Sequence, residues 1–198
     1  MINFLNDNLS EPFVRLKEIY DQAITANQGS IEAISISSFD ESLSEVNSRY
    51  VNLKAVINDE FIFFTNYNSP KSIEFESHNQ IAATLYWASI NVQIRIKAKI
   101  RKTSPEYNQK YFLERSPKKN ALAISSSQSK PIDSYESIVK NYKKSLEFDN
   151  LEKCPDFWGG YSFTPYYFEF WEGHESRLNK REAYAKNADN WQQCLLQP

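Results

Sequence analysis

The chain is poor in glycine, with four glycines among 198 residues. The nucleotide-binding loops of Rossmann and P-loop enzymes need several closely spaced glycines, because their backbone approaches a phosphate directly. The sequence contains no GxGxxG, no Walker-type loop and no GxSxG. These absences argue against dinucleotide-binding, kinase-like and serine-hydrolase functions.

Cysteine is also scarce. Cys154 and Cys194 lie forty residues apart, with no CxxC pair and no histidine close to either. A tetrahedral metal site needs four close ligands, so we expect no metal. We expect both thiols to be reduced and buried.

The chain has no strong excess of charge of either sign and no long apolar run. Its formal net charge of −2 at pH 7 predicts no nucleic-acid partner, because a polyanion requires a broad cationic surface. No segment reaches the roughly eighteen apolar residues of a membrane span. The start of the chain lacks a basic segment followed by an apolar one, so we expect no signal peptide, no membrane partner and a cytoplasmic location.

Aromatic residues, in contrast, are abundant, with thirteen Phe, twelve Tyr and four Trp. A chain of this length and composition can bury a sizeable core without disulfide bonds or metals. We therefore expect one domain over residues 1–198.

Period-two alternation of apolar and polar residues dominates after the first helix. The clearest strand runs from Val92 to Arg101, with aliphatic side chains on one face and polar or basic ones on the other. Further strands are expected at 34–36, 51–57, 61–64, 166–171, 181–186 and 191–196, the last two joined by a turn at 187–190.

Helical spacing predicts four helices. The first covers about residues 11–24, and the others begin at about Ser69 or span about 104–115 and 134–148. Two of them start with Ser-Pro, which predicts a capping serine followed by a proline in the first turn. Short strands with helices between them indicate a mainly β protein with helices, a β-barrel rather than a doubly wound sheet.

Two basic clusters lie in the first half of the chain. Ser69-Pro70-Lys71 places a helix start beside a cation, which suits a phosphate, although a capped surface helix has the same pattern. Arg49 and Lys54 differ in strand parity, so a regular strand would direct them to opposite faces. Both clusters are also compatible with solvated charge.

Two further clusters combine arginine with aromatic residues. Tyr107, Tyr111 and Arg115 recur at helical spacing and share one face, which suits either helix stabilisation or an anion clamp. Arg177 and Arg181 lie four residues apart after Trp171. The arginine fork can bind a phosphate with two hydrogen bonds, and a tryptophan can pack on a ring system.

Taken in order, these pieces resemble the pyridoxamine 5'-phosphate oxidase family from about Glu11 to the end of the chain. The family's motifs are similar to Arg49 to Lys54, Phe64-Thr65-Asn66, Ser69-Pro70-Lys71, Tyr86-Trp87 with Gln93, Tyr111 to Arg115, and Gln128-Ser129. The end of the chain carries the most specific resemblance, in Phe157 to Tyr161, Glu169-Phe170-Trp171, and Arg177 with Arg181.

The resemblance implies an FMN-binding split β-barrel that forms a homodimer, with FMN where the two subunits meet. It assigns the cofactor to Arg49, Lys54, Phe64, Thr65, Ser69, Lys71, Gln93, Gln128, Ser129, Trp171 and Arg181. It assigns a phosphorylated vitamin B6 substrate to Lys54, Tyr111, Arg115, Lys119, Arg177 and Asn179. The implied activity is FMN-dependent oxidation of this substrate to pyridoxal 5'-phosphate, with molecular oxygen as acceptor.

Three positions depart from the family near its substrate. Pro70 stands where the family has Arg, Lys119 where it has a phosphate-binding Ser, and Asn179 where it has His. These departures leave two other functions open, a split-barrel flavin oxidoreductase for another substrate and a non-catalytic flavin- or haem-binding protein.

Overall fold

The computed structural model describes residues 1–5, 9–188 and 190–198. Its strands form a ten-stranded sheet in the order β1-β4-β5-β8-β7-β6-β2-β3, with β9 beside β8 and β10 beside β9. The pairs are antiparallel except β1 with β4, which is parallel. The strands are β1 Asn3–Leu5, β2 Ala33–Asp40, β3 Glu45–Asn52, β4 Ala55–Ile57, β5 Glu60–Asn66, β6 Gln80–Trp87, β7 Val92–Lys102, β8 Trp158–Glu172, β9 Lys180–Asn187 and β10 Asn190–Leu195.

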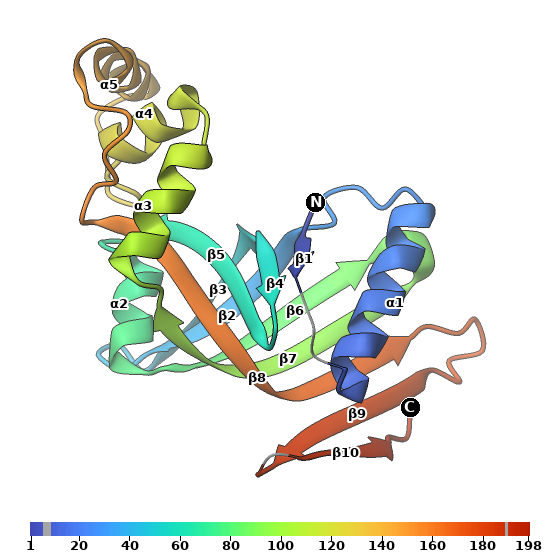
Figure 1. Cartoon of the computed structure of the whole chain (residues 1–198). Helices are drawn as coiled ribbons and strands as arrows, with labels where there is room; N and C mark the ends of the chain where they lie inside the picture. Colours follow the sequence, from blue (N-terminus) through green and yellow to red (C-terminus); the bar gives the residue numbers. More distant parts are fainter. Residues whose placement is uncertain (6–8, 189) are drawn as a thin grey trace.

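Strand β8 joins the two parts of the curled sheet. Its first half pairs with β5, its second half with β9, and β7 runs along nearly all of it. A register shift between Lys97 and Ala98 of β7 accompanies the change of partner, as expected where a strand bends. The result is the open barrel in Figure 1, with the β9–β10 hairpin at its lower edge.

The core lies inside this barrel and is largely aromatic. Phe13 of the first helix meets Phe168 of β8 with ring centroids 5.3 Å apart and Phe61 of β5 at 6.2 Å. The predicted alternation along β7 is confirmed, because Ile94 and Ile96 are fully buried while the basic residues between and after them are exposed. A mainly β fold with helices is thus observed.

The four predicted helices are present as α1 Glu11–Thr25, α2 Pro70–Ser77, α3 Pro105–Glu114 and α5 Tyr135–Phe148, and a short 3₁₀ turn η1 covers Ala88–Ile90. Ser104 caps α3 by accepting from the Tyr107 amide. Ser69 does not cap α2, because its hydroxyl donates to the Asn66 carbonyl instead, so the prediction of a capping serine is wrong there.

Helix α4, Pro117–Ser125, was not predicted, although Ser116-Pro117 carries the same start signal as the others. It is one residue longer than the predicted helix α2, so the Ser-Pro signal could have identified it as well. Figure 1 shows α3, α4 and α5 grouped at one end of the barrel, away from α1.

The strand expected over 51–57 is two strands. The chain changes partner between them, since the Leu53 amide donates to the Glu32 carbonyl and the Lys54 amide to the Ile62 carbonyl, both at 2.8 Å. The strand expected at 166–171 is the end of β8, which begins earlier, at Trp158. The sequence does not indicate this earlier start, because glycines are uncommon inside strands. Gly159 is nevertheless required there, since a Cβ at this position would collide with the Tyr67 hydroxyl.

The expectation of two buried thiols is wrong. Cys154 is half-buried and Cys194 is exposed, because Cys194 lies on β10, whose residues are mostly exposed. The turn expected at 187–190 includes residue 189, which lies outside the described residues. Within the described ranges, no helix has both the length and the apolar character needed to cross a membrane.

Candidate functional site

A cavity of about 760 Å³, here called the main cavity, lies between β3, β5, α2 and the segment from α3 to the end of α4. Its wall contains ten residues expected from the sequence to bind a ligand: Arg49, Lys54, Phe64, Thr65, Lys71, Tyr111, Arg115, Lys119, Gln128 and Ser129. We call these ten the cavity group. The break between β3 and β4 explains how Arg49 and Lys54 both reach it despite their different strand parity.

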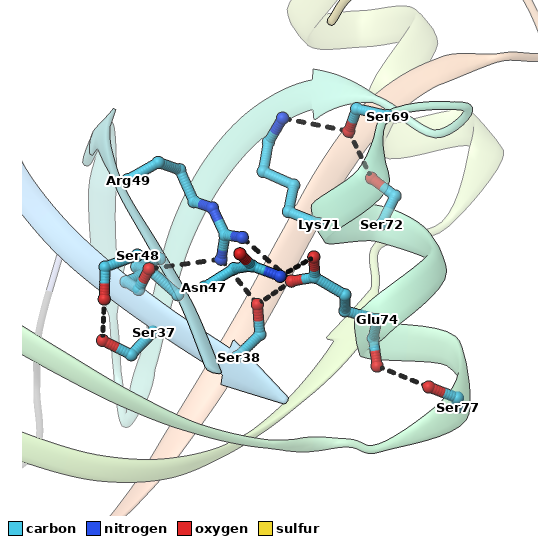
Figure 2. A network of polar contacts seen from close by, with 11 residues as sticks. Ser37, Ser38, Asn47, Ser48, Arg49, Ser69, Lys71, Ser72, Glu74 and Ser77 are labelled. Carbon is cyan, nitrogen blue, oxygen red and sulfur yellow. Dashed lines mark hydrogen bonds and ion pairs between the residues drawn. The ribbon is translucent and has the colours of Figure 1, made fainter. Parts of the chain in front are cut away.

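Arg49 lines the main cavity and is held in place by a network of polar contacts, which Figure 2 shows. Its Nη2 donates to Glu74 Oε2 at 2.9 Å, and its Nη1 donates to Ser38 Oγ at 2.5 Å and to the Ile36 carbonyl at 3.3 Å. Glu74 is 3 % exposed. The guanidinium is therefore oriented before any ligand arrives.

Lys71 lies near Arg49, one helical turn before Glu74 on α2. Its Nζ donates to Ser69 Oγ at 2.9 Å. Burial, and next the charge of Arg49, lower the pKa of Lys71 to about 8, while Glu74 opposes that shift. Ser69 itself is fully buried and lies behind Lys71 rather than in the cavity wall, so the structure does not place its hydroxyl where a ligand would touch it.

A second cationic region of the main cavity wall consists of Lys54, Arg115 and Lys119. Arg115 follows the last residue of α3, donates from Nη2 to the Lys119 carbonyl at 2.9 Å, and lies over the Trp158 ring at 4.3 Å from its centroid. Burial lowers the pKa of Lys54; the charges of Lys119 and Arg115 lower it further, and Glu32 opposes them. Three cations therefore gather here.

Stacked aromatic rings lie beside these cations, and two of them, Phe64 and Tyr111, line the main cavity. Phe64 stacks on Tyr111 with centroids 3.7 Å apart and planes 5° apart, and on Trp158 at 5.3 Å and 11°. Burial raises the pKa of Tyr111, so its phenol stays protonated and can donate a hydrogen bond. Trp158 was not expected in the site; its position between Phe64 and Arg115 follows from β5 pairing with β8.

Gln128 and Ser129 reach the main cavity because α4 carries the chain back to β5. Gln128 Oε1 accepts from Thr65 Oγ1 at 3.0 Å and from the Asn66 amide at 3.2 Å. Ser129 has a φ of 68°, which turns the chain sharply at the cavity wall. The unpredicted helix is thus what joins these two residues to Thr65.

Besides Ser69, five expected site residues do not line the main cavity: Gln93, Trp171, Arg177, Asn179 and Arg181. We call them the hairpin group. Gln93 on β7 lies opposite Trp171 on β8, which lies opposite Arg181 on β9, so the three form one row across the sheet. Arg177 and Asn179 follow in the loop before β9, where Asn179 Oδ1 accepts from the His174 amide at 3.0 Å. The chain therefore carries its expected site residues in two separate groups.

Comparison with solved structures defines the class of fold. PhzG from Burkholderia lata 383, solved in complex with tetrahydrophenazine-1-carboxylic acid, matches with a TM-score of 0.90 and 25% identity over 97% of this chain and 95% of that one. A pyridoxamine 5'-phosphate oxidase-related, FMN-binding protein from Nostoc punctiforme PCC 73102 matches with a TM-score of 0.75 and 11% identity, over 92% of this chain and 97% of that one. The fold is the split β-barrel of this class of flavin-binding proteins.

Comparison of sequences gives the family. The chain is 34% identical over 196 residues to the pyridoxine/pyridoxamine 5'-phosphate oxidase of Coxiella burnetii (strain RSA 493 / Nine Mile phase I), covering 98% of this chain and 100% of that one. It is 35% identical over 194 residues to the enzyme of the same name from Haemophilus influenzae (strain ATCC 51907 / DSM 11121 / KW20 / Rd), covering 98% and 92%. Residues 158–198 match the pyridoxine 5'-phosphate oxidase C-terminal dimerisation region. The chain belongs to the pyridoxine/pyridoxamine 5'-phosphate oxidase family.

Proposed function

We propose that this protein is an FMN-dependent oxidase that converts pyridoxine or pyridoxamine 5'-phosphate to pyridoxal 5'-phosphate, with molecular oxygen as acceptor. The observation that carries the proposal is one cavity whose wall contains two groups of cations, Arg49 with Lys71 and Lys54 with Arg115 and Lys119, as two phosphate-bearing ligands in one site would require. The relatives that cover the whole chain carry this enzyme's name.

The group formed by Arg49 and Lys71 suits the phosphate of FMN. Arg49 is oriented in advance, and the pKa of Lys71 is lowered first by burial and then by the positive charge of Arg49. An incoming phosphate would bring negative charge to both cations. Phe64, Thr65, Gln128 and Ser129 line the same cavity, and Ser69 acts through Lys71.

The group formed by Lys54, Tyr111, Arg115 and Lys119 suits the phosphate of the substrate. Lys54, Arg115 and Lys119 line the cavity together, and the charges of Lys119 and Arg115 both lower the pKa of Lys54. A phosphate would bring negative charge to these three cations. Lys119, in place of serine, adds the third cation to this group.

Bound FMN would supply the redox chemistry, accepting a hydride from C4' of the substrate and passing its electrons to oxygen. The side chains of this protein have a different part in the reaction. Their charges hold the two phosphates at two places in one cavity, which fixes the separation and orientation of the reacting groups. Phe64 and Tyr111 stack on each other and give part of this cavity wall an apolar surface, and Trp158 stacks on Phe64 from outside the wall.

We also propose that two copies of the chain complete each site. The hairpin group lies apart from the main cavity, and it falls in or beside the region that matches a family dimerisation segment. In a homodimer, Gln93, Trp171 and Arg181 of one chain would line the flavin bound by the cavity group of the other, with Arg177 and Asn179 directed at the substrate. Each chain acts as one domain over residues 1–198, in the cytoplasm.

A second candidate is oxidation of a ring-bearing carboxylic acid by the same flavin fold. The structural relative with a TM-score of 0.90 was solved with such an acid, and Pro70, Lys119 and Asn179 depart from the oxidase pattern near the substrate. A carboxylate carries one negative charge and a phosphate up to two, so three cations in one group favour the phosphate.

The decisive experiment measures flavin content and oxygen uptake. Purified protein should be yellow and should release FMN on denaturation, and it should consume oxygen and form hydrogen peroxide with pyridoxine 5'-phosphate. Release of FAD or haem, or no chromophore even after incubation with FMN, would refute the cofactor. Light scattering should give twice the chain mass; a stable monomer that holds FMN would refute the shared site.

A further inference from the structure

Glu74 is a buried carboxylate beside Arg49 in the wall of the main cavity, and the functions proposed above give it no role. It lies on α2, is 3 % exposed, and lines the cavity together with Arg49 and Lys71. Its position is buried beside Phe75, where an apolar side chain would be less costly than an ionised one. The contacts of Glu74 explain why a carboxylate stands there.

Three donors from two strands converge on this carboxylate (Figure 2). Oε2 accepts from Arg49 Nη2 at 2.9 Å and from the Ser38 hydroxyl, and Oε1 accepts from Asn47 Nδ2 at 3.1 Å. Ser38 also accepts from Arg49 Nη1, so arginine, serine and glutamate form a closed triangle. The triangle fixes both the position of the Arg49 guanidinium and its rotation.

We propose that Glu74 is a positioning residue of the FMN phosphate site, which holds the Arg49 guanidinium at the cavity wall and offsets the combined positive charge of Arg49 and Lys71. The inference rests on the proposed binding of FMN. Glu74 would not touch FMN, and yet it would set the affinity of the protein for FMN.

The pH dependence of FMN affinity distinguishes a charge effect of Glu74 from a merely structural contact, because it reports the charges around Lys71. Arg49 lowers the pKa of Lys71 and Glu74 raises it; the cavity wall also carries Asp40, Glu45, Lys54, Arg115 and Lys119. FMN binding favours the protonated ammonium, so affinity should fall as pH rises above about 8. Removing the charge of Glu74 should move this fall to lower pH.

The test is a fluorescence titration of the full-length protein with FMN between pH 6.5 and 9.5, a range in which the FMN phosphate is mostly a dianion because its second pKa is about 6. Glu74→Gln keeps the size of the side chain and removes its charge. We expect affinity at pH 7 to fall about tenfold, as for loss of one charged hydrogen bond. We expect the pH midpoint to move down by about 0.5–1 unit. Glu76→Gln, on the exposed side of the same helix, is the matched control and should change neither value.

A double-mutant cycle separates positioning from general stability. If Glu74 acts through Arg49, then Glu74→Gln should cost much less affinity in an Arg49→Met background than in the wild type. Should Glu74→Gln fail to fold, Asn47→Ala removes one of its hydrogen bonds and should produce a smaller loss of affinity of the same kind.

Three results would overturn the inference. An equal loss of affinity in both backgrounds with an unmoved midpoint would leave Glu74 a purely structural residue, and so would unchanged FMN binding in Glu74→Gln. Wild type that binds no FMN at any pH would refute the proposed cofactor, and the inference would fall with it.

Discussion

The carboxylate of Glu169 on β8 holds the guanidinium of Arg181 on β9: Oε1 accepts a hydrogen bond from Nε at 2.9 Å and forms an ion pair with Nη2 at 2.8 Å. Oε2 accepts from Arg95 Nη1 at 2.9 Å and from the Tyr167 hydroxyl at 3.1 Å. Glu169 is 2 % exposed. The arrangement parallels that of Glu74 and Arg49: a buried carboxylate orients an arginine that the sequence assigns to the cofactor.

The first prediction concerns the stability supplied by Glu169. Glu169→Gln should lower the free energy of unfolding by about 2 kcal/mol, because it weakens charged hydrogen bonds to two arginines at a buried site. Urea unfolding at fixed protein concentration measures this, and the exposed Glu175→Gln is the control. Equal midpoints for the two variants would show that the pair contributes no net stability.

The second prediction concerns Arg181 and the cofactor. Arg181→Ala should weaken FMN binding by about 1.5–3 kcal/mol, the usual size of a charge-assisted contact. Fluorescence titration measures the affinity, with Lys186→Ala, an exposed cation on the same strand, as control. Unchanged affinity in Arg181→Ala would remove Arg181 from the site.

The third prediction concerns the pH dependence of stability without flavin. The folded-state pKa of Lys71 is about 8, below the ordinary value of 10.5. Below pH 8 the folded protein carries a buried ammonium, which destabilises it. Between about 8 and 10.5 the unfolded chain binds the extra proton, so stability at this site rises with pH. Lys71→Met should therefore be more stable than wild type at pH 7.

This gain should shrink by up to about 1.4 kcal/mol for each pH unit above 8. Urea unfolding of flavin-free protein at pH 7 and 9.5 tests the sign, with Lys110→Met on the exposed side of α3 as control. A gain that stays the same at both pH values would mean that Lys71 is not the titrating group.

The fourth prediction separates substrate binding from cofactor binding. Arg115→Ala should raise KM for pyridoxine 5'-phosphate about tenfold or more, since it removes a charged contact, while FMN stays bound. Arg115→Lys should recover part of the loss, because the charge remains but the planar fork is gone. Loss of FMN in Arg115→Ala would assign Arg115 to the cofactor instead.

The fifth prediction concerns the departures from the family. Unphosphorylated pyridoxine should be used far less well than its phosphate, and Asn179→His should preserve or raise turnover, because histidine can carry a charge near neutrality and asparagine cannot. Steady-state oxygen uptake compares them. If wild type ignores the phosphate and Asn179→His with Lys119→Ser restores turnover, the native substrate is another compound, such as a ring-bearing carboxylic acid.

The sequence by itself determined the strongly periodic elements and the chemistry of the site. The alternation along β7 and the helical spacing of α1 and α5 are local patterns, so they can be read without the fold. The order of motifs from Arg49 to Arg181 was likewise enough to identify the family. A motif consists of residue types at fixed spacing, and both can be read from the sequence without the fold.

The tertiary structure decided which of these residues meet. Lys54 reaches the same cavity as Arg49 because the backbone changes its hydrogen-bonding partner at residues 53–54. The Leu53 amide still bonds next to β2, whereas the Lys54 amide bonds to β5. Helix α4, which sequence periodicity missed, returns Gln128 to Thr65. Glu74 carries no signal in the sequence, since a glutamate in a short helix is ordinarily solvated, and Glu169 belongs to a family motif that gave it no role. They orient arginines only because α2 packs against β2 and because β8 pairs with β7 and β9, and these tertiary contacts are what local patterns do not encode.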